Sequence, residues 1–160
     1  MPKRITSFDR KDSIIFVLWG TRFEEAAATI FTTKLRQVGL CVQLVSLAGQ
    51  RPVGQNGLAL YPDLPLGDAL RIAKKAVCVI LPCSAETFRQ MECDPRLSEF
   101  FHQANANDAR FIVSTMDSIQ KTGLKKLVIA NELLSTYQNV PNLMQFADEL
   151  ASSLANVYGV

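Results

Sequence analysis

Short apolar runs, separated by segments with helical periodicity, constrain the fold of this chain more than any other feature. Residues 76–81 read AVCVIL and residues 13–19 read SIIFVLW. A continuous apolar run of this length is typical of a parallel strand that is buried on both faces of its sheet. Residues 23–39, which follow the first run, carry apolar side chains at helical spacing. We expect Thr21 to be the N-cap of this helix and Gly39 to end it.

The rest of the chain continues the alternation. Further strands are predicted at 40–47, 110–114 and 125–130, and a hairpin at 51–62 with its tip at 55–57. Further helices are predicted to start at Asp63 or Gly67, at Ser84 (one or two turns to Met91), at Asp94-Pro95, at Ser118 and at Pro141 or Asn142. Residues 131–140 are left open between a loop and an edge strand at Leu133–Tyr137. This order predicts an α/β sandwich of three layers, with a mainly parallel central sheet and helices on both faces. We expect one domain at 13–160 after a flexible lead-in at 1–12.

Composition excludes several classes of protein. A net charge of +2 over 160 residues, without a Lys/Arg cluster, does not predict nucleic-acid binding. The sequence contains no run of 18 apolar residues, so it predicts no membrane span, and we expect a cytoplasmic protein. Three of the four cysteines (Cys41, Cys78, Cys83 and Cys93) lie in or beside apolar runs, which fits a reducing compartment. Their spacing lacks a C-x-x-C pair, so we predict no metal site, and no cofactor is indicated.

The segment 109–118, ARFIVSTMDS, is where a function is expected. Its apolar residues end at Ser114, and the polar residues that follow predict a strand that passes directly into a helix. In α/β proteins this junction, at the carboxyl end of a central strand, commonly holds nucleophiles and ligands. The tip of the turn, however, carries Met116, whose thioether neither attacks a carbonyl nor transfers a proton.

Four segments together resemble the ThiJ/PfpI superfamily, which has the class I glutamine amidotransferase-like fold and includes the parkinsonism-associated protein deglycase. They are FVLWGTRFEEAAATIFTTKLRQVGLCVQLVSLAG, RPVGQNGLALYPDLPLGDA, VCVILPCS and RFIVSTMDS. The resemblance spans roughly residues 13–160 and is weaker after Gly123. It implies a flavodoxin-like sandwich and a homodimer.

The resemblance also implies that the catalytic residues of the family are missing here. The position of its nucleophilic cysteine is Met116, and the position of its glutamate is near Ala27, although an alignment shifted by two residues would place Glu25 there. The glycine pair that accommodates an oxyanion appears as Cys83 and Ser84. The histidine that often follows the nucleophile has no counterpart, since the one histidine, His102, precedes it.

Two classes of function follow. The first is a non-catalytic domain, or pseudoenzyme, that binds a small ligand or a protein, with a regulatory role as a variant; its candidate binding residues are Trp19, Glu24, Glu25, Cys83, Ser84, Thr115, Met116 and Asp117. The second is a cysteine-dependent hydrolase or a glyoxalase/deglycase-like enzyme that uses Cys83, with Glu25 or His102 as the base. Most of these residues also have a plain structural alternative: Trp19 as packing on the neighbouring helix, Cys83 as core, the two glutamates as complements to the helix dipole, and Thr115 and Asp117 as caps.

Overall fold

The structure is a computed structural model that describes residues 12–47, 52–127 and 133–159. Its strands are β1 (Ile14–Trp19), β2 (Val42–Ser46), β3 (Leu64–Pro65), β4 (Ala76–Leu81), β5 (Arg110–Val113) and β6 (Leu134–Thr136). Its α-helices are α2 (Glu25–Gln37), α3 (Leu66–Arg71), α4 (Ala85–Met91), α5 (Pro95–Ala106), α6 (Asp117–Gln120), α7 (Leu124–Leu127) and α8 (Leu143–Tyr158). The lead-in predicted at 1–12 lies outside the described residues, except for Asp12.

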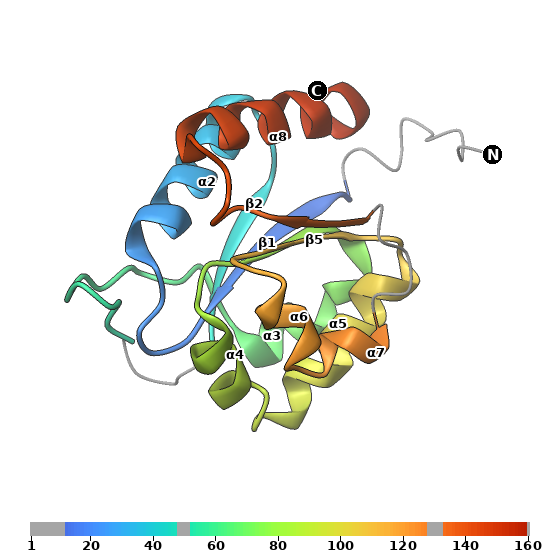
Figure 1. The fold of residues 1–160 in the computed structure, drawn as a ribbon. Coiled ribbons are helices and arrows are strands. Elements are labelled where there is room, and N and C mark those ends of the chain that lie inside the picture. Colours follow the sequence, from blue (N-terminus) through green and yellow to red (C-terminus); the bar gives the residue numbers. More distant parts are fainter. Residues whose placement is uncertain (1–11, 48–51, 128–132, 160) are drawn as a thin grey trace.

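The strands form one sheet in the order β3-β2-β1-β4-β5-β6, and every neighbouring pair is parallel. Helices α2 and α8 cover one face of the sheet, and α3 to α7 lie on the other (Figure 1). This arrangement confirms the predicted flavodoxin-like α/β sandwich, with a parallel central sheet and helices on both faces.

Each central strand contributes side chains to two separate cores, because successive side chains of a strand point to opposite faces of the sheet. In β1, Phe16 and Leu18 pack under α5, whereas Val17 and Trp19 pack under α2 and α8. The same division applies to β4. Because both faces of such a strand are buried, none of its positions suits a polar side chain. This explains the continuous apolar runs of the sequence.

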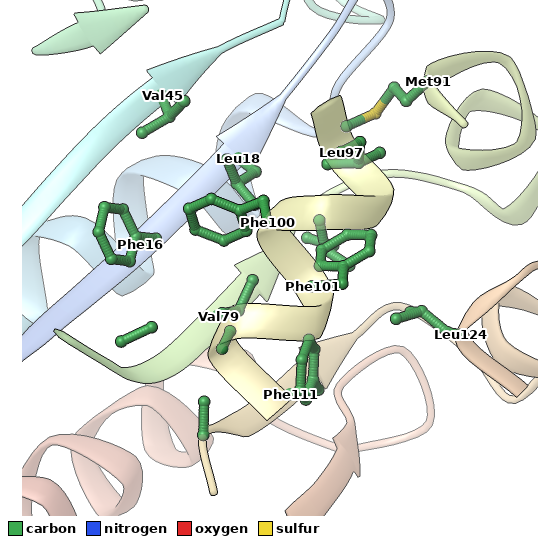
Figure 2. Close-up of a cluster of buried hydrophobic side chains, with 14 of the residues drawn as sticks. Phe16, Leu18, Val45, Val79, Met91, Leu97, Phe100, Phe101, Phe111 and Leu124 are labelled. Carbon is green, nitrogen blue, oxygen red and sulfur yellow. The ribbon is translucent and has the colours of Figure 1, made fainter. Parts of the chain in front are cut away.

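Several aromatic side chains pack together in the core around α5, as Figure 2 shows. Phe100 is fully buried, and its ring meets the ring of Phe16 edge to face, with centroids 5.0 Å apart. The ring of Phe101 packs against the rings of Phe88 and Phe111, with centroids 5.8 and 5.9 Å apart, respectively. Helix α5 is therefore fixed to the sheet over most of its length.

Several helix boundaries follow the predicted capping residues. Asp94 caps α5 by accepting a hydrogen bond from the Arg96 amide (3.0 Å), with Pro95 at the first helical position. Asn142 caps α8 in the same way, through the amide of Gln145 (3.2 Å). Gly39 follows α2 with φ of +83°, a left-handed conformation that glycine adopts without a steric cost.

The start of α2 differs from the prediction. The helix begins at Glu25 rather than after Thr21, and its N-cap position is Glu24. Arg22 lies in the left-handed region, with φ of 63°, and its amide donates to the carbonyl of Val53 (2.8 Å). The residues after β1 thus form a loop attached to the 52–60 segment, and this tertiary contact overrides the local capping preference.

The strand predicted at Lys125–Ala130 is wrong for its described part, because residues 124–127 form the helix α7. Residues 128–130 lie outside the described residues. An apolar run of this length does not distinguish a strand from a buried helical turn. Here the fully buried Leu124 packs into the core beneath α5, which favours the helical turn.

The open segment 131–140 contains a strand where it is described. Leu134–Thr136 forms the edge strand β6, in which Ser135 pairs with Ile112 of β5. The predicted hairpin is present as a bridge between Val53 and Ala59, with Gly57 at its tip in the left-handed region. Among the described helices, none has the length and apolar character needed to cross a membrane.

Candidate functional site

The carboxyl ends of the central strands meet where the chain order changes direction. From β1 the chain passes to β2 and β3 on one side, and it then returns to β4 on the other. Such a switch point is the usual location of a ligand site in an open parallel sheet. Here the loop after β1 lies against the loop after β4, because the Glu24 amide donates to the carbonyl of Pro82 (2.7 Å).

A polar pocket of about 550 Å³ opens beside this point, between α4 and the turn after β5. We call it the elbow pocket. It is lined by Ser84, Ala85, Glu86, Arg89, Ser114, Thr115, Asp117, Lys121 and Gln138. Its volume lies within the range of about 300–1,000 Å³ that is typical of small-molecule sites. Its lining is more polar than is usual for such sites.

Three of the predicted ligand-binding residues, Ser84, Thr115 and Asp117, line the elbow pocket. The Ser84 hydroxyl also accepts a hydrogen bond from the Thr87 amide (3.2 Å) and so caps α4. Thr115 and Asp117 were expected as alternatives to cap the helix after β5. That helix, α6, instead starts from Met116 without a side-chain cap. The side chains of Thr115 and Asp117 therefore face the pocket without this structural duty.

Met116 occupies the tip of the turn and is 48% exposed. Its carbonyl accepts hydrogen bonds from Ile119 and Gln120, so the turn is the first turn of α6. A residue at this position is open to solvent at the carboxyl end of β5. The side chain that occupies it, however, is a thioether.

Ser114, which follows β5, and Gln138, which follows β6, are linked to each other where they line the pocket. Ser114 is buried, and its hydroxyl donates to Oε1 of Gln138 (3.1 Å), while the Gln138 amide donates to the Ser114 carbonyl (2.9 Å). The backbone bond fixes the position of residue 138, and the bond from the Ser114 hydroxyl orients the Gln138 side chain. They leave its amino group as a hydrogen-bond donor at the pocket.

Two other predicted residues are buried and do not line the elbow pocket. Trp19 is fully buried, and its ring stacks at a tilt on that of Phe23 with centroids 5.3 Å apart, so it is core. Cys83 is only 1% exposed, and its sulfur lies 3.9 Å from that of Met91. Burial raises the pKa of the Cys83 thiol to about 12, and the Glu24 carboxylate adds to this shift. At neutral pH this cysteine is a thiol rather than a thiolate.

Glu24 faces a buried tyrosine that sequence analysis did not single out. Tyr137 is 4% exposed, and its ring packs edge to face on Phe31. Burial raises the pKa of Tyr137, and the nearby Glu24 carboxylate raises it further. Within the described residues the hydroxyl has no hydrogen-bond partner of good geometry, although Glu24 and Ser114 lie near it. Tyr137 is thus a neutral phenol in the core beneath α2 and does not line the elbow pocket.

Glu25 points away from the pocket and holds the hairpin. It is 3% exposed, and its carboxylate accepts hydrogen bonds from the backbone amides of Asn56 (2.7 Å) and Leu58 (3.2 Å). A Cβ atom on Gly54 would lie 2.2 Å from Cδ of Glu25, so only glycine leaves room for this contact. The bonds from the hairpin occupy the carboxylate that the enzyme alternative requires as a base.

The hairpin is expected to loosen in acid through Glu25. Burial acts to raise the pKa of the Glu25 carboxyl, but its own backbone amide and those of Leu58 and Asn56 outweigh burial and lower the pKa below 4.5. A carboxyl whose pKa is depressed in the folded protein stabilises the fold at any pH above its pKa in the unfolded chain. This contribution is lost as the pH falls through the pKa of the folded protein. Amide proton shifts of Asn56 and Leu58, followed by NMR from pH 7 to pH 3, should therefore move together below pH 4.5.

The control for this titration is Glu25→Gln, which keeps the shape but removes the ionisation. In that variant the two amide shifts should show no transition of their own. A common transition that survives the substitution would assign the effect to another carboxyl group.

The remaining catalytic candidates also lie apart from the pocket. Ala27, near the position of the family glutamate, is 2% exposed and packs its methyl group in the core beneath α2. His102 is exposed on α5 and does not line the elbow pocket. Across residues 12–47, 52–127 and 133–159, no three His, Cys, Asp or Glu side chains gather to hold a metal ion.

Five lining residues escaped the sequence analysis: Ala85, Glu86, Arg89, Lys121 and Gln138. Lys121 lies four residues after Asp117, so helical spacing from Asp117 would have placed it on the same side. Glu86 and Arg89 share a face with each other, but their spacing from Ser84 gave no such signal. Gln138 gave no such signal, because its segment was open between a strand and a loop.

Comparisons with solved structures place this fold among those of the DJ-1 superfamily. A DJ-1 superfamily protein from Salmonella typhimurium, crystallised as a cysteine-to-alanine mutant, superposes with a TM-score of 0.71 at 18% identity, over 91% of this chain and 92% of that one. Drosophila melanogaster DJ-1beta superposes with a TM-score of 0.67 at 16% identity, and oxidised Toxoplasma gondii DJ-1 with a TM-score of 0.67 at 14% identity. Both matches cover 92% of this chain and 91% of the other chain. The resemblance to the ThiJ/PfpI superfamily is thereby confirmed for the fold.

No family model matches the sequence, and no curated protein matches it. Identities of this size carry the fold and not the chemistry. The function has to be argued from the side chains of this chain.

Proposed function

We propose that this chain, which has the fold of the DJ-1/ThiJ/PfpI superfamily, is a non-catalytic domain that binds a small polar ligand in the elbow pocket. The observation that carries the proposal is the pairing of Met116 at the exposed tip of the turn with a polar pocket beside it. The family resemblance assigns the nucleophile to this tip, and a thioether supplies no nucleophile. The pocket itself remains, with hydroxyl, amide and charged groups that suit a polar ligand.

The enzyme alternative, which uses Cys83, has less support. A nucleophilic cysteine acts as a thiolate in an accessible, electropositive environment. Cys83 is buried next to Met91, and burial together with the Glu24 carboxylate raises its pKa to about 12. The candidate bases do not serve it either, since Glu25 holds the hairpin and His102 lies on the exposed side of α5.

Alkylation of the native protein by iodoacetamide tests this distinction. We expect Cys83 to react at least tenfold more slowly than the exposed Cys41 and Cys93, because it is buried and protonated. Peptide mass spectrometry over a time course gives the three rates separately, and the protein unfolded in urea is the control in which the rates should become similar. Fast, selective modification of Cys83, with turnover of methylglyoxal, would overturn the non-catalytic proposal.

Three further parts of the proposal concern its setting. A homodimer rests on the family resemblance, and light scattering on a size-exclusion column tests it. A regulatory role follows if the ligand alters the binding of a protein partner. A cytoplasmic location is supported by the four cysteines, all of which are free.

A further inference from the structure

We infer that the ligand of the elbow pocket is a small zwitterion, with a carboxylate and an ammonium group close together as in an amino acid. This inference rests on the proposed function, because it names the chemical class of ligand for the same pocket. It is carried by the arrangement of charges around the pocket.

The first wall of the pocket carries one charge of each sign, and both are free. Glu86 and Arg89 lie on α4 three residues apart and both line the pocket. Residues at this spacing share one face of a helix, with Cβ atoms about 5–6 Å apart. Among the described residues, neither side chain has an ion-pair partner within 4 Å. The ammonium and carboxylate of an amino acid are joined through a single carbon atom, so one such ligand can meet both side chains from the same side.

The opposite wall is already balanced. Lys121 and Asp117, four residues apart on this side, form an ion pair at 3.5 Å. A ligand with a single negative charge would meet Arg89 but also the neighbouring Glu86 carboxylate, and a simple cation would meet the reverse. A zwitterion satisfies both groups of α4 at once. The net charge of the pocket, two cations against two carboxylates, also matches a ligand with no net charge.

The rest of the lining provides hydrogen bonds instead of apolar contacts. Thr115 and Gln138 line the same space, and the bond from the Ser114 hydroxyl to Oε1 orients the side-chain amide of Gln138. These groups suit a polar side chain on the ligand. Because Arg is a planar donor of paired hydrogen bonds, Arg89 is the anchor expected for the carboxylate.

The test is an NMR titration of the full chain with glycine, serine and glutamine as zwitterions, and with acetate and methylamine as single-charge probes. We expect at least one amino acid to shift the amides of Arg89, Thr115 and Gln138, with an affinity at least tenfold higher than that of either probe. Arg89→Gln and Glu86→Gln should each weaken that binding at least tenfold. Arg71→Gln, on the exposed surface of α3, is the matched control and should leave binding unchanged.

The outcomes separate the inference from the proposed function. Acetate or methylamine binding as tightly as the amino acids, or no effect of Glu86→Gln, overturns the zwitterion but leaves a binding pocket. If neither the five compounds nor a wider panel of small polar metabolites shifts these amides, both the zwitterion and the small-ligand function are overturned.

Discussion

Replacing Phe100 with alanine is expected to lower the free energy of unfolding by about 3–5 kcal/mol. Its ring is fully buried and packs edge to face on the rings of Phe16 and Phe101, with centroid separations of 5.0 and 6.2 Å. The substitution removes the ring from the contact between α5 and β1 and leaves a cavity that the flanking aromatic residues fill only in part. Since a domain of this size has about 5–15 kcal/mol of stability in total, the variant should be marginal or partly unfolded.

Urea denaturation followed by circular dichroism measures this loss. Met144→Ala is a suitable control, because Met144 is 47% exposed on α8 and its truncation should change stability by no more than about 0.5 kcal/mol. Phe100→Leu fills most of the space and should fall between the two. A loss below 1 kcal/mol for Phe100→Ala would mean that α5 does not depend on this contact.

The sheet could be predicted from the sequence because its strands are buried on both faces. Burial on both sides demands an unbroken apolar run, and the runs 13–19, 76–81 and 110–114 each correspond to a strand. The same logic failed at Lys125–Ala130. There the apolar residue that matters, Leu124, is buried by a helical turn against α5, and periodicity does not separate the two cases over so few residues.

The site was predicted less completely than the fold. The turn at 114–118 and Ser84 were placed correctly at the carboxyl ends of β5 and β4, because the position follows from the strand order. The direction of Glu25 could not be predicted, since it depends on backbone amides of a hairpin about thirty residues later. Likewise, the depth of Cys83 depends on how Met91 packs over it. Contacts of this kind are set by tertiary packing.

Met116→Cys should place a reactive thiol at the elbow and so show what this position lacks. An exposed cysteine has a pKa of about 8.5, whereas that of Cys83 is raised to about 12. At pH 7 the introduced thiol is therefore ionised about 10³ times more often. A less basic thiolate is also a weaker nucleophile, with a Brønsted slope of about 0.5, so the net advantage in rate is about 10². Peptide mass spectrometry after timed iodoacetamide treatment measures this ratio within one molecule.

The same variant tests whether the nucleophile is the only missing part. We expect no turnover of methylglyoxal by Met116→Cys, because the family glutamate position is near Ala27, whose methyl group is buried in the core, and Glu25 is held by the hairpin. Without a carboxylate at the family position, the thiol lacks the partner that would accept and return its proton. Turnover gained from this single change would show that an acid or base is retained near the elbow, with the Glu24 carboxylate as the first group to replace by glutamine. Fast alkylation without turnover would instead support a pocket that has kept its access to solvent and lost its reaction.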